Sequence, residues 1–232
     1  MYYYDPTYIL LIPALILTFW AQAKVKGAYN KYSRERNSTG LTGADAARKM
    51  LEANGLRHVP INILKGDALT NYYNPKDQTL NLSQQVYSQP SIAAISIACH
   101  EVGHACQDAE NYSMLALRNT IVPIVNFTSY ISWPLIIIGI MFTGSNNYGR
   151  LIFDIGILCF VVVILFHLVT LPVEFNASNR ALAGMEELGI VNQDDYKGSK
   201  KVLSAAAMTY VAALAVAVAN LLRIFIISRN RN

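Results

Sequence analysis

The chain has 232 residues, of which 53% are hydrophobic and only 15% are charged. Soluble domains carry about 25% charged residues, so the chain lacks the charge of a water-facing surface, and it is far too apolar to be disordered. The net charge of +4 is too small and too scattered to predict nucleic-acid binding. Three widely spaced cysteines exclude a small secreted domain held together by disulfides. The composition therefore predicts an integral membrane protein.

Four stretches are apolar enough to cross a bilayer, which takes about 20 residues of helix. The first, at 8–23, is short but uncharged, and the second and third cover 121–143 and 151–171. The fourth lies within 203–227 and is weaker, because it is rich in alanine. A short polar link at 144–149 joins the second and third stretches, which predicts a membrane hairpin.

Basic residues predict the orientation of these spans, because Lys and Arg are retained on the cytoplasmic side. Residues 24–120 contain eleven of them and residues 173–202 contain four, whereas at most four fall on the other side. Both polar segments are therefore expected in the cytoplasm. No Lys or Arg precedes the first stretch, which favours an uncleaved anchor over a signal peptide. The side of the C-terminal tail stays open, since the fourth stretch could instead lie on the membrane.

The first polar segment predicts a helix, two short strands and a longer helix, in that order. A capping box that starts at Thr42 begins the first helix, and Gly55 ends it. Residues 59–64 and 79–82 are apolar runs separated by turn residues, which predict strands. The longer helix is expected from Ser91 to at least residue 111.

Two of the four histidines lie in an H-E-x-x-H sequence on this longer helix. One helical turn separates His100 from His104, so both imidazoles lie on one face and can reach one Zn²⁺ at about 2.0–2.1 Å. Glu101 projects from the same side, where it can take a proton from water without being a ligand. The simpler alternative is a pair of hydrogen-bonded core histidines. Ser96 and Gln107 extend a polar stripe along this face of an otherwise apolar helix, which favours the metal site.

A catalytic zinc needs a third protein ligand and an open position. The remaining histidines, His58 and His167, and the carboxylates are the candidates. Glu174 follows the third apolar stretch directly, on a helix that is expected to end at Gly189. Ser178 lies one turn further on the same face, where it can hydrogen-bond a ligand. That Glu174 merely caps or solvates this helix stays an open alternative on these residues alone.

Two longer motifs carry a resemblance to a known family. They are Ser-Ile-Ala-Ala-Ile-Ser-Ile-Ala-Cys-His-Glu-Val-Gly-His-Ala-Cys-Gln at 91–107 and Leu-Pro-Val-Glu-Phe-Asn-Ala-Ser at 171–178. With them the chain resembles, over nearly its whole length, the YugP-like membrane zinc metallopeptidases of bacteria. The order of its parts is also similar to that of the HtpX-like and CAAX-prenyl proteases. The resemblance implies one Zn²⁺ held by His100, His104 and Glu174, which is a gluzincin site.

The chain departs from the family pattern in two places. Relatives tend to have Asp-His-Tyr-Asp-Pro where this chain has Asn-Tyr-Tyr-Asn-Pro at 71–75, and an Asp where it has Asn176. In the HtpX-like group an Asp also stands at the position of Ser178, so support of a histidine is expected to be weaker here. The metal ligands are unaffected, and the departures are expected to alter substrate preference or rate.

Peptide hydrolysis also needs a donor for the oxyanion. Tyr72, Tyr73 and Arg180 are the candidates, and a purely structural role is the alternative for each. The peptide substrate is expected to lie extended along an edge strand within residues 71–82, where it would add a strand to the sheet.

The predicted fold is a mainly α integral membrane protein, with about four transmembrane helices and a small α+β, gluzincin-like catalytic domain on the cytoplasmic face. The expected divisions are a transmembrane anchor at 1–23, a cytoplasmic segment at 24–120, a transmembrane hairpin at 121–171, a cytoplasmic helix at 172–202, and a C-terminal transmembrane helix with a short tail at 203–232.

The expected function is that of a zinc-dependent endopeptidase in a bacterial plasma membrane. Its partners would be the lipid bilayer and a peptide or membrane-protein substrate, and Glu101 would be the general base. One rival is a zinc-binding pseudoprotease that acts as a scaffold or regulator, which the changed segment at 71–75 favours. Another is a transport component, suggested by Asp154 and His167 within the third apolar stretch.

Overall fold

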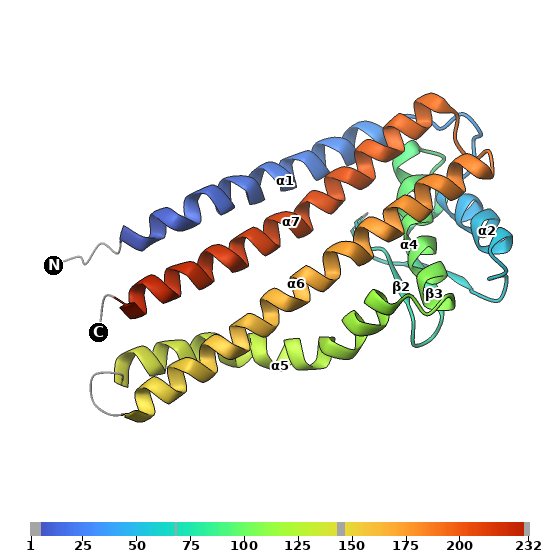
Figure 1. The fold of residues 1–232 in the computed structure, drawn as a ribbon. Helices are drawn as coiled ribbons and strands as arrows, with labels where there is room; N and C mark the ends of the chain where they lie inside the picture. Colours follow the sequence, from blue (N-terminus) through green and yellow to red (C-terminus); the bar gives the residue numbers. More distant parts are fainter. Residues whose placement is uncertain (1–5, 68, 143–146, 230–232) are drawn as a thin grey trace. The chain divides into compact units, whose positions relative to one another are not determined.

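The computed structural model describes residues 6–67, 69–142 and 147–229. Within these ranges the chain is mostly helical and contains one small sheet (Figure 1), as the sequence predicts. In chain order the elements are a 3₁₀ helix η1 (Pro6–Leu11), α1 (Ile12–Tyr32), α2 (Gly43–Ala53), β1 (Ile61–Leu64), β2 (Tyr72–Asn74), β3 (Thr79–Ser83), α3 (Gln84–Ser88), α4 (Ile92–Ala109), α5 (Ser113–Phe142), α6 (Asn147–Glu187) and α7 (Gln193–Arg229).

The chain divides into two compact units. The first, which we call the apolar unit, is drawn from residues 1–20, 117–171 and 209–232. The second, the polar unit, comprises 21–116 and 172–208 and contains the H-E-x-x-H sequence. The long helices α1, α5, α6 and α7 each contribute residues to both units.

In the part of the chain that the structure describes, four helical segments are long and apolar enough to cross a membrane. Many of their large apolar side chains are exposed, for example Phe127 and Tyr130, which are 66% and 83% exposed. Such a surface suits lipid, because an apolar patch of this extent is rare on soluble proteins. The four segments are Pro6–Tyr32, Ser113–Phe142, Tyr148–Glu187 and Gln193–Arg229.

Glycines allow α5 and α6 to pack closely in the apolar unit. A Cβ at Gly139 would lie 2.5 Å from the backbone nitrogen of Phe153, and one at Gly156 would lie 2.8 Å from that of Ile136. Small residues of this kind are what let helices associate in lipid. The two helices therefore pack as the expected hairpin requires, although residues 143–146 of the polar link lie outside the described residues.

One basic residue within α7 has partners in the N-terminal 3₁₀ helix. The guanidinium of Arg223 lies 3.8 Å from the centre of the Tyr8 ring, and its Nε donates a hydrogen bond of 3.1 Å to the hydroxyl of Thr7. A cation–π contact and a hydrogen bond reduce the cost of a charge on an apolar helix.

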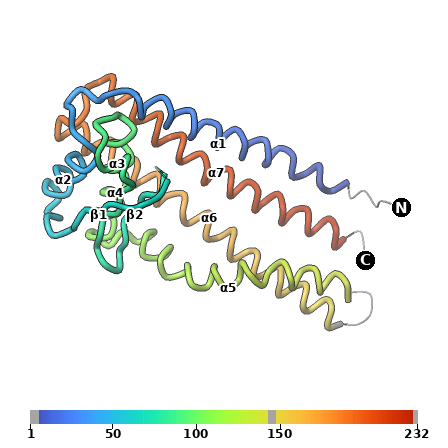
Figure 2. Tube along the Cα trace, turned by 180° about the vertical axis from the view of Figure 1, so that it is seen from behind, coloured from blue at the N-terminus to red at the C-terminus, as the bar shows by residue number. Residues whose placement is uncertain are grey.

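The polar unit is built around α4, whose side chains are almost all buried. Its apolar face joins α2, β3 and α6 in one core, which includes Leu51, Leu82, Val102 and Met185. The sheet, which has three strands within the described residues, has the order β1-β3-β2. Its outer strands β1 and β2 are labelled in Figure 2. Strand β1 is parallel to β3 and β2 is antiparallel to it. Strand β2 is thus an edge strand, and it packs on α4.

Local signals place the helix boundaries where the sequence predicts them. The hydroxyl of Thr42 accepts a hydrogen bond of 3.1 Å from the Asp45 amide, and the Asp45 carboxylate accepts one of 3.0 Å from the Thr42 amide. Gly55 and Gly189 have φ values of 73° and 61°, the left-handed conformation that ends a helix and suits glycine. The hydroxyl of Ser91 accepts from the Ala94 amide at the start of α4.

Some predicted boundaries were wrong. The helix expected to reach at least residue 111 ends at Ala109, and Asn111 has a left-handed φ of 54°. The third apolar stretch and the helix that carries Glu174 form one continuous helix, α6, because Pro172 removes only one donor and the turns on both sides continue. The expected edge strand at 71–82 is a hairpin of two strands, in which Gln78 has a φ of 49°. Since β3 lies in the middle of the sheet, β2 is the strand of this hairpin that has an edge where a peptide could pair.

Gly103 sets the distance between α4 and α6. A Cβ at this position would lie 2.5 Å from the carbonyl oxygen of Ala177, so Gly103→Ala must push the helices apart. Overpacking of this kind costs about 1–3 kcal/mol, and we expect a lower midpoint in thermal unfolding of the detergent-solubilised protein. Gly27→Ala is the matched control, because a Cβ on Gly27 in α1 meets nothing within 4 Å. An unchanged midpoint for Gly103→Ala would contradict the packing described.

Candidate metal centre

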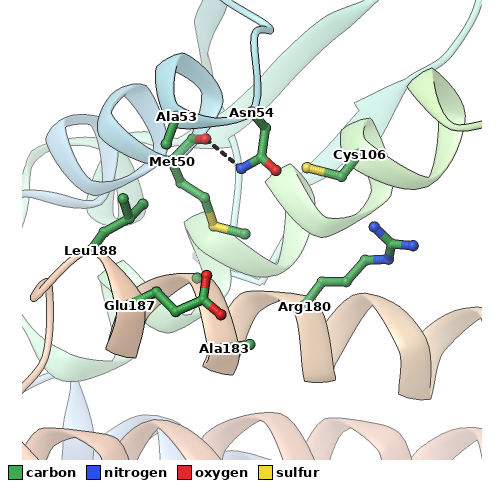
Figure 3. Close-up of a pocket in the computed structure, with 9 residues that line it drawn as sticks. Met50, Ala53, Asn54, Cys106, Arg180, Ala183, Glu187 and Leu188 are labelled. Carbon is green, nitrogen blue, oxygen red and sulfur yellow. Dashed lines mark hydrogen bonds between the residues drawn. The ribbon is translucent and has the colours of Figure 1, made fainter.

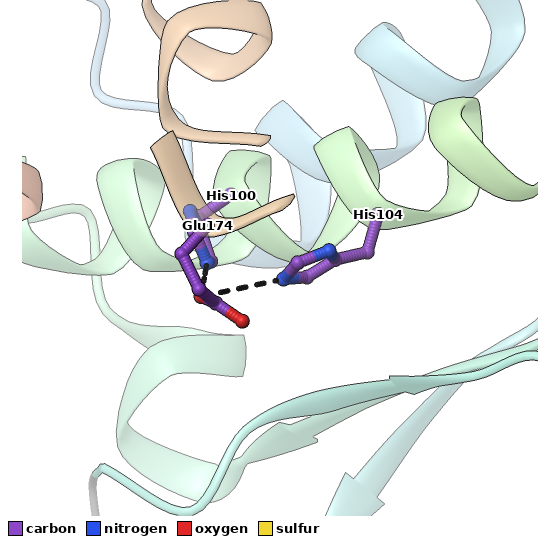
Figure 4. A group of neighbouring side chains, drawn as sticks. All are labelled: His100, His104 and Glu174. Atoms are coloured by element: carbon purple, nitrogen blue, oxygen red, sulfur yellow. Dashed lines mark ion pairs between the residues drawn. The ribbon is translucent and has the colours of Figure 1, made fainter. Parts of the chain in front are cut away.

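Three side chains from two helices converge in the polar unit (Figure 4). His100 and His104 come from α4 and Glu174 comes from α6. The Nε2 atoms of His100 and His104 lie 3.4 and 3.7 Å from the same oxygen of Glu174, Oε2. All three donor atoms lie within 4.8 Å of one another.

These separations fit a zinc ion. Around a tetrahedral zinc with bonds of about 2.0–2.1 Å, two ligand atoms stand roughly 3.3 Å apart. The observed 3.4 and 3.7 Å are close to that value, and they exceed the usual length of a hydrogen bond, about 2.7–3.2 Å. Two imidazole nitrogens and one carboxylate oxygen are also a donor set that zinc prefers when a fourth position is left for water or substrate.

The surroundings keep the carboxylate in the ionised form that binds a metal. Glu174 is only 5% exposed, and burial alone would raise its pKa. The imidazoles of His100 and His104 reverse this effect and lower the pKa of Glu174 well below its usual range. Burial lowers the pKa of His104, but the carboxylates of Glu174 and Glu101 more than compensate, and the net shift is upward.

Glu101 lies beside this group and is held by the edge strand. Its side chain is buried, and its Oε2 accepts a hydrogen bond of 3.0 Å from the backbone amide of Tyr73 in β2. The sequence gives no local sign of this contact, because it joins a helix to a strand that only tertiary packing brings together. The position of the carboxylate is thus coupled to the only strand of 71–82 that has an open edge.

Each histidine has a hydrogen-bonding partner at its second ring nitrogen. The hydroxyl of Ser178, on α6, lies 3.2 Å from Nδ1 of His100. The side-chain oxygen of Gln107, on α4, lies 2.9 Å from Nδ1 of His104. Ser178 was expected in this role. Gln107 was noticed in the sequence only as part of a polar stripe, although its position one turn after His104 was a signal for the same role.

The side chains of Tyr72 and Tyr73, two of the candidate oxyanion donors, lie on opposite faces of β2. Tyr73 donates a hydrogen bond of 2.9 Å from its hydroxyl to Asp108. Burial and this bond raise the pKa of Tyr73. Tyr72 is the next residue of β2, so it points to the opposite face of the strand, and it is 46% exposed.

Arg180 bonds residues outside the group of three candidate ligands. Its two terminal nitrogens each lie 2.7 Å from an oxygen of Glu110, and its Nε donates a hydrogen bond of 2.8 Å to the side-chain oxygen of Asn176. These bonds raise the pKa of Arg180 and lower that of Glu110. The guanidinium thus joins the end of α4 to α6.

Other candidate ligands remain apart from the group. His58 is exposed between α2 and β1, and His167 lies in the apolar part of α6. Burial raises the pKa of the Cys99 thiol to about 12 and, as the main cause, that of Cys106 to about 11. Neither thiol belongs to the group of three donors, and both cysteines pack in the core of the polar unit.

A pocket of about 330 Å³ lies between α2, α4 and α6 (Figure 3). Its lining includes Met50, Cys106, Arg180 and Glu187, and it contains none of the three side chains of the candidate metal centre. Of the two charged residues in this lining, Arg180 is paired with Glu110, and Glu187 adds a carboxylate.

Comparison with known proteins identifies the family. Residues 7–229 match the family described as "Putative neutral zinc metallopeptidase", and the chain belongs to this family. It is 47% identical over 226 residues to the "Putative membrane protease YugP" of Bacillus subtilis (strain 168), an alignment that covers 96% of this chain and 98% of that protein. No solved structure matches the chain. The resemblance seen in the two motifs is thereby confirmed, and the family implies zinc as the metal.

Substitution of Ser178 tests whether its hydrogen bond to His100 increases the affinity for zinc. Loss of such a partner typically weakens metal binding 10- to 100-fold, so we expect Ser178→Ala to lower the zinc affinity by roughly tenfold. Ser178→Asp, whose carboxylate is a better acceptor for Nδ1–H, is expected to raise it. Competition with a chelator of known affinity measures both. Equal affinities of wild type, Ser178→Ala and the exposed control Ser204→Ala would contradict this role.

Proposed function

We propose that this member of the zinc metallopeptidase family is a membrane-embedded endopeptidase of the gluzincin type. One Zn²⁺ would be held by His100, His104 and Glu174, and Glu101 would be the general base. The observation that carries the proposal is the convergence of three buried or half-buried donors within 4.8 Å, with both histidine nitrogens near the edge length of a zinc tetrahedron from the Glu174 oxygen. The pseudoprotease alternative gains no support from the site, because each of these four side chains is present.

The residues around the metal divide the chemical work. Zinc, when bound, supplies Lewis-acid activation of water and polarises the scissile carbonyl. Glu101 would accept the proton of the attacking water and pass it to the leaving amine. The Tyr73 amide holds one oxygen of this carboxylate, so it fixes the direction from which the proton is taken. Ser178 would hold the ring of His100 in its ligating orientation.

An extended peptide could pair with the open edge of β2. Pairing of this type uses main-chain hydrogen bonds for affinity and leaves alternate side chains for specificity. Since the amide of Tyr73 in this strand already bonds Glu101, the edge is close to the proposed base. None of the three candidate oxyanion donors gains support: the polar ends of Tyr73 and Arg180 bond Asp108 and Glu110, and Tyr72 points to the face of β2 opposite to Tyr73.

The proposed location is a bacterial plasma membrane, crossed several times, with the active site facing the cytoplasm. The excess of Lys and Arg in residues 24–120 and 173–202 supports this orientation. Glu174 follows an apolar stretch within the same helix, α6, which supports a site at the membrane surface. The natural substrates would then be membrane proteins or unfolded chains near the bilayer.

Zinc content tests the ligand set. We expect about one zinc per chain in the purified full-length protein and a large loss in Glu174→Ala and His100→Ala, because two ligands hold the ion far less tightly than three. His58→Ala is the matched control, since His58 is exposed and lies outside the group. Equal zinc content in Glu174→Ala and wild type, measured by elemental analysis after dialysis, would refute the proposed centre.

Cleavage of an unfolded reporter protein tests the base. Glu101→Gln keeps the shape of the side chain but cannot accept the proton, so we expect kcat to fall by about 10²–10⁴ while zinc content stays unchanged. The exposed Glu52→Gln serves as the control. If Glu101→Gln binds zinc and cleaves the reporter as wild type does, the protein does not use this base. If wild type binds zinc but cleaves nothing, the scaffold alternative is favoured.

A further inference from the structure

A chain of hydrogen bonds leads away from the metal centre on the side of His104. Nδ1 of His104 lies 2.9 Å from Oε1 of Gln107. Nε2 of Gln107 lies 2.8 Å from the carbonyl oxygen of Val173 and 2.9 Å from Oδ1 of Asn176. Asn176 in turn accepts a hydrogen bond from Arg180. Gln107 is fully buried, so each of its polar atoms must be satisfied within the protein.

The carbonyl of Val173 fixes which way the Gln107 amide points. A backbone carbonyl oxygen can only accept a hydrogen bond, so the Gln107 atom 2.8 Å from it must be the amide nitrogen. The opposite orientation would place Oε1 of Gln107 against two oxygens, at 2.8 and 2.9 Å. In a fully buried position that arrangement would leave the acceptors without donors, which is costly.

Arg180 fixes the same orientation independently. Its Nε–H can only donate, so the Asn176 atom 2.8 Å away must be the amide oxygen. The Gln107 atom that faces this oxygen must then be a donor, which is again the amide nitrogen. The Val173 carbonyl, which is an acceptor, and the Arg180 Nε–H, which is a donor, therefore independently require the same orientation of the Gln107 amide.

The orientation of Gln107 determines the tautomer of His104. Since Oε1 of Gln107 accepts from Nδ1, the proton of the neutral ring must be on Nδ1 and the lone pair on Nε2. Nε2 is the atom that faces Glu174. We propose that Gln107 is a positioning residue that holds His104 in the Nδ1–H tautomer, with Nε2 presented to the metal. This inference rests on the metal centre of the proposed function and adds a residue to it.

Ser178 cannot do the same for His100 by itself. A serine hydroxyl both donates and accepts, so its contact of 3.2 Å with Nδ1 is compatible with either tautomer. Control of the ring proton by an amide anchored at two points is specific to His104. The network also needs only an acceptor oxygen at position 176, which Asn supplies as well as Asp would.

Two variants of Gln107 separate control of the tautomer from a merely structural bond between α4 and α6. Gln107→Leu removes both halves of the amide, and we expect zinc affinity to fall roughly 10- to 100-fold. Gln107→Glu keeps an acceptor for His104 and loses the donor to Val173 and to Asn176. Zinc affinity is therefore expected to stay within about threefold of wild type, which is less than the change expected when a ligand loses its hydrogen-bonding partner. The buried Ser96→Ala, whose hydroxyl bonds its own helix at Ile92, is the matched control.

The measurements use full-length protein in detergent, with zinc alone as the ligand and a competing chelator. If Gln107→Glu loses as much affinity as Gln107→Leu, Gln107 acts as a structural bond and the proposal is overturned. Unchanged affinity in Gln107→Leu overturns it as well. If Gln107→Leu does not fold, the comparison of Gln107→Glu with Ser96→Ala still decides.

A spectrum of the wild-type protein tests the tautomer directly. With ¹⁵N-labelled histidine there are only four side chains to assign, and two-bond ¹H–¹⁵N correlations of the zinc-loaded protein distinguish the tautomers. We expect His104 to be protonated at Nδ1, and protonation at Nε2 would overturn the proposal. If Glu174→Ala keeps its zinc, the metal centre itself has failed. If Glu174→Ala loses zinc affinity and Gln107→Leu does not, the metal centre is supported and the proposed role of Gln107 is wrong.

Discussion

The close approach of α4 to α6 is the constraint on which the site depends. The candidate ligands come two from one helix and one from another, so they converge only where these helices lie close, and Gly103 opposite Ala177 permits the short distance observed. At this helix separation, Nε2 of His100 and Nε2 of His104 lie 3.4 and 3.7 Å from Oε2 of Glu174. Because the contact lies within the turn that joins His100 to His104, packing and metal geometry are set by the same residues.

The same contact makes it tolerable to bury charged groups. A carboxylate and two imidazoles removed from water would be costly unless each found partners. Glu174 faces both rings, and each ring has a second partner in Ser178 or Gln107. Polar networks of this kind are stabilising only when every member is satisfied, which explains why the bonds continue from Gln107 to the surface.

Features that depend on neighbouring residues could be predicted from the sequence, and features that depend on tertiary contacts could not. The cap at Thr42 and the pairing of His100 with His104 each depend on residues within one helical turn, and both could be predicted. Glu174 comes from far along the chain, so the residues alone left it open and only the family resemblance assigned it. The sequence predicted a span and a separate helix that carries Glu174, where the structure has one continuous helix. Strand β2 is too short to show alternation and is defined by its pairing with β3.

The contacts of the residues that depart from the family pattern show which of these departures could affect the site. The side-chain oxygen of Asn71 accepts a hydrogen bond of 2.8 Å from the Ser83 amide, and that of Asn176 accepts from Gln107 and Arg180. An Asp would accept in the same places, so these two changes preserve the bonds and alter only the charge. The amide of Asn74, in contrast, donates to Asp77, which an Asp at this position could not do. Tyr72 differs, because it lies half-exposed on the open edge strand next to the residue that holds Glu101. A change there acts on what the strand offers a peptide, which points to substrate preference and away from loss of catalysis.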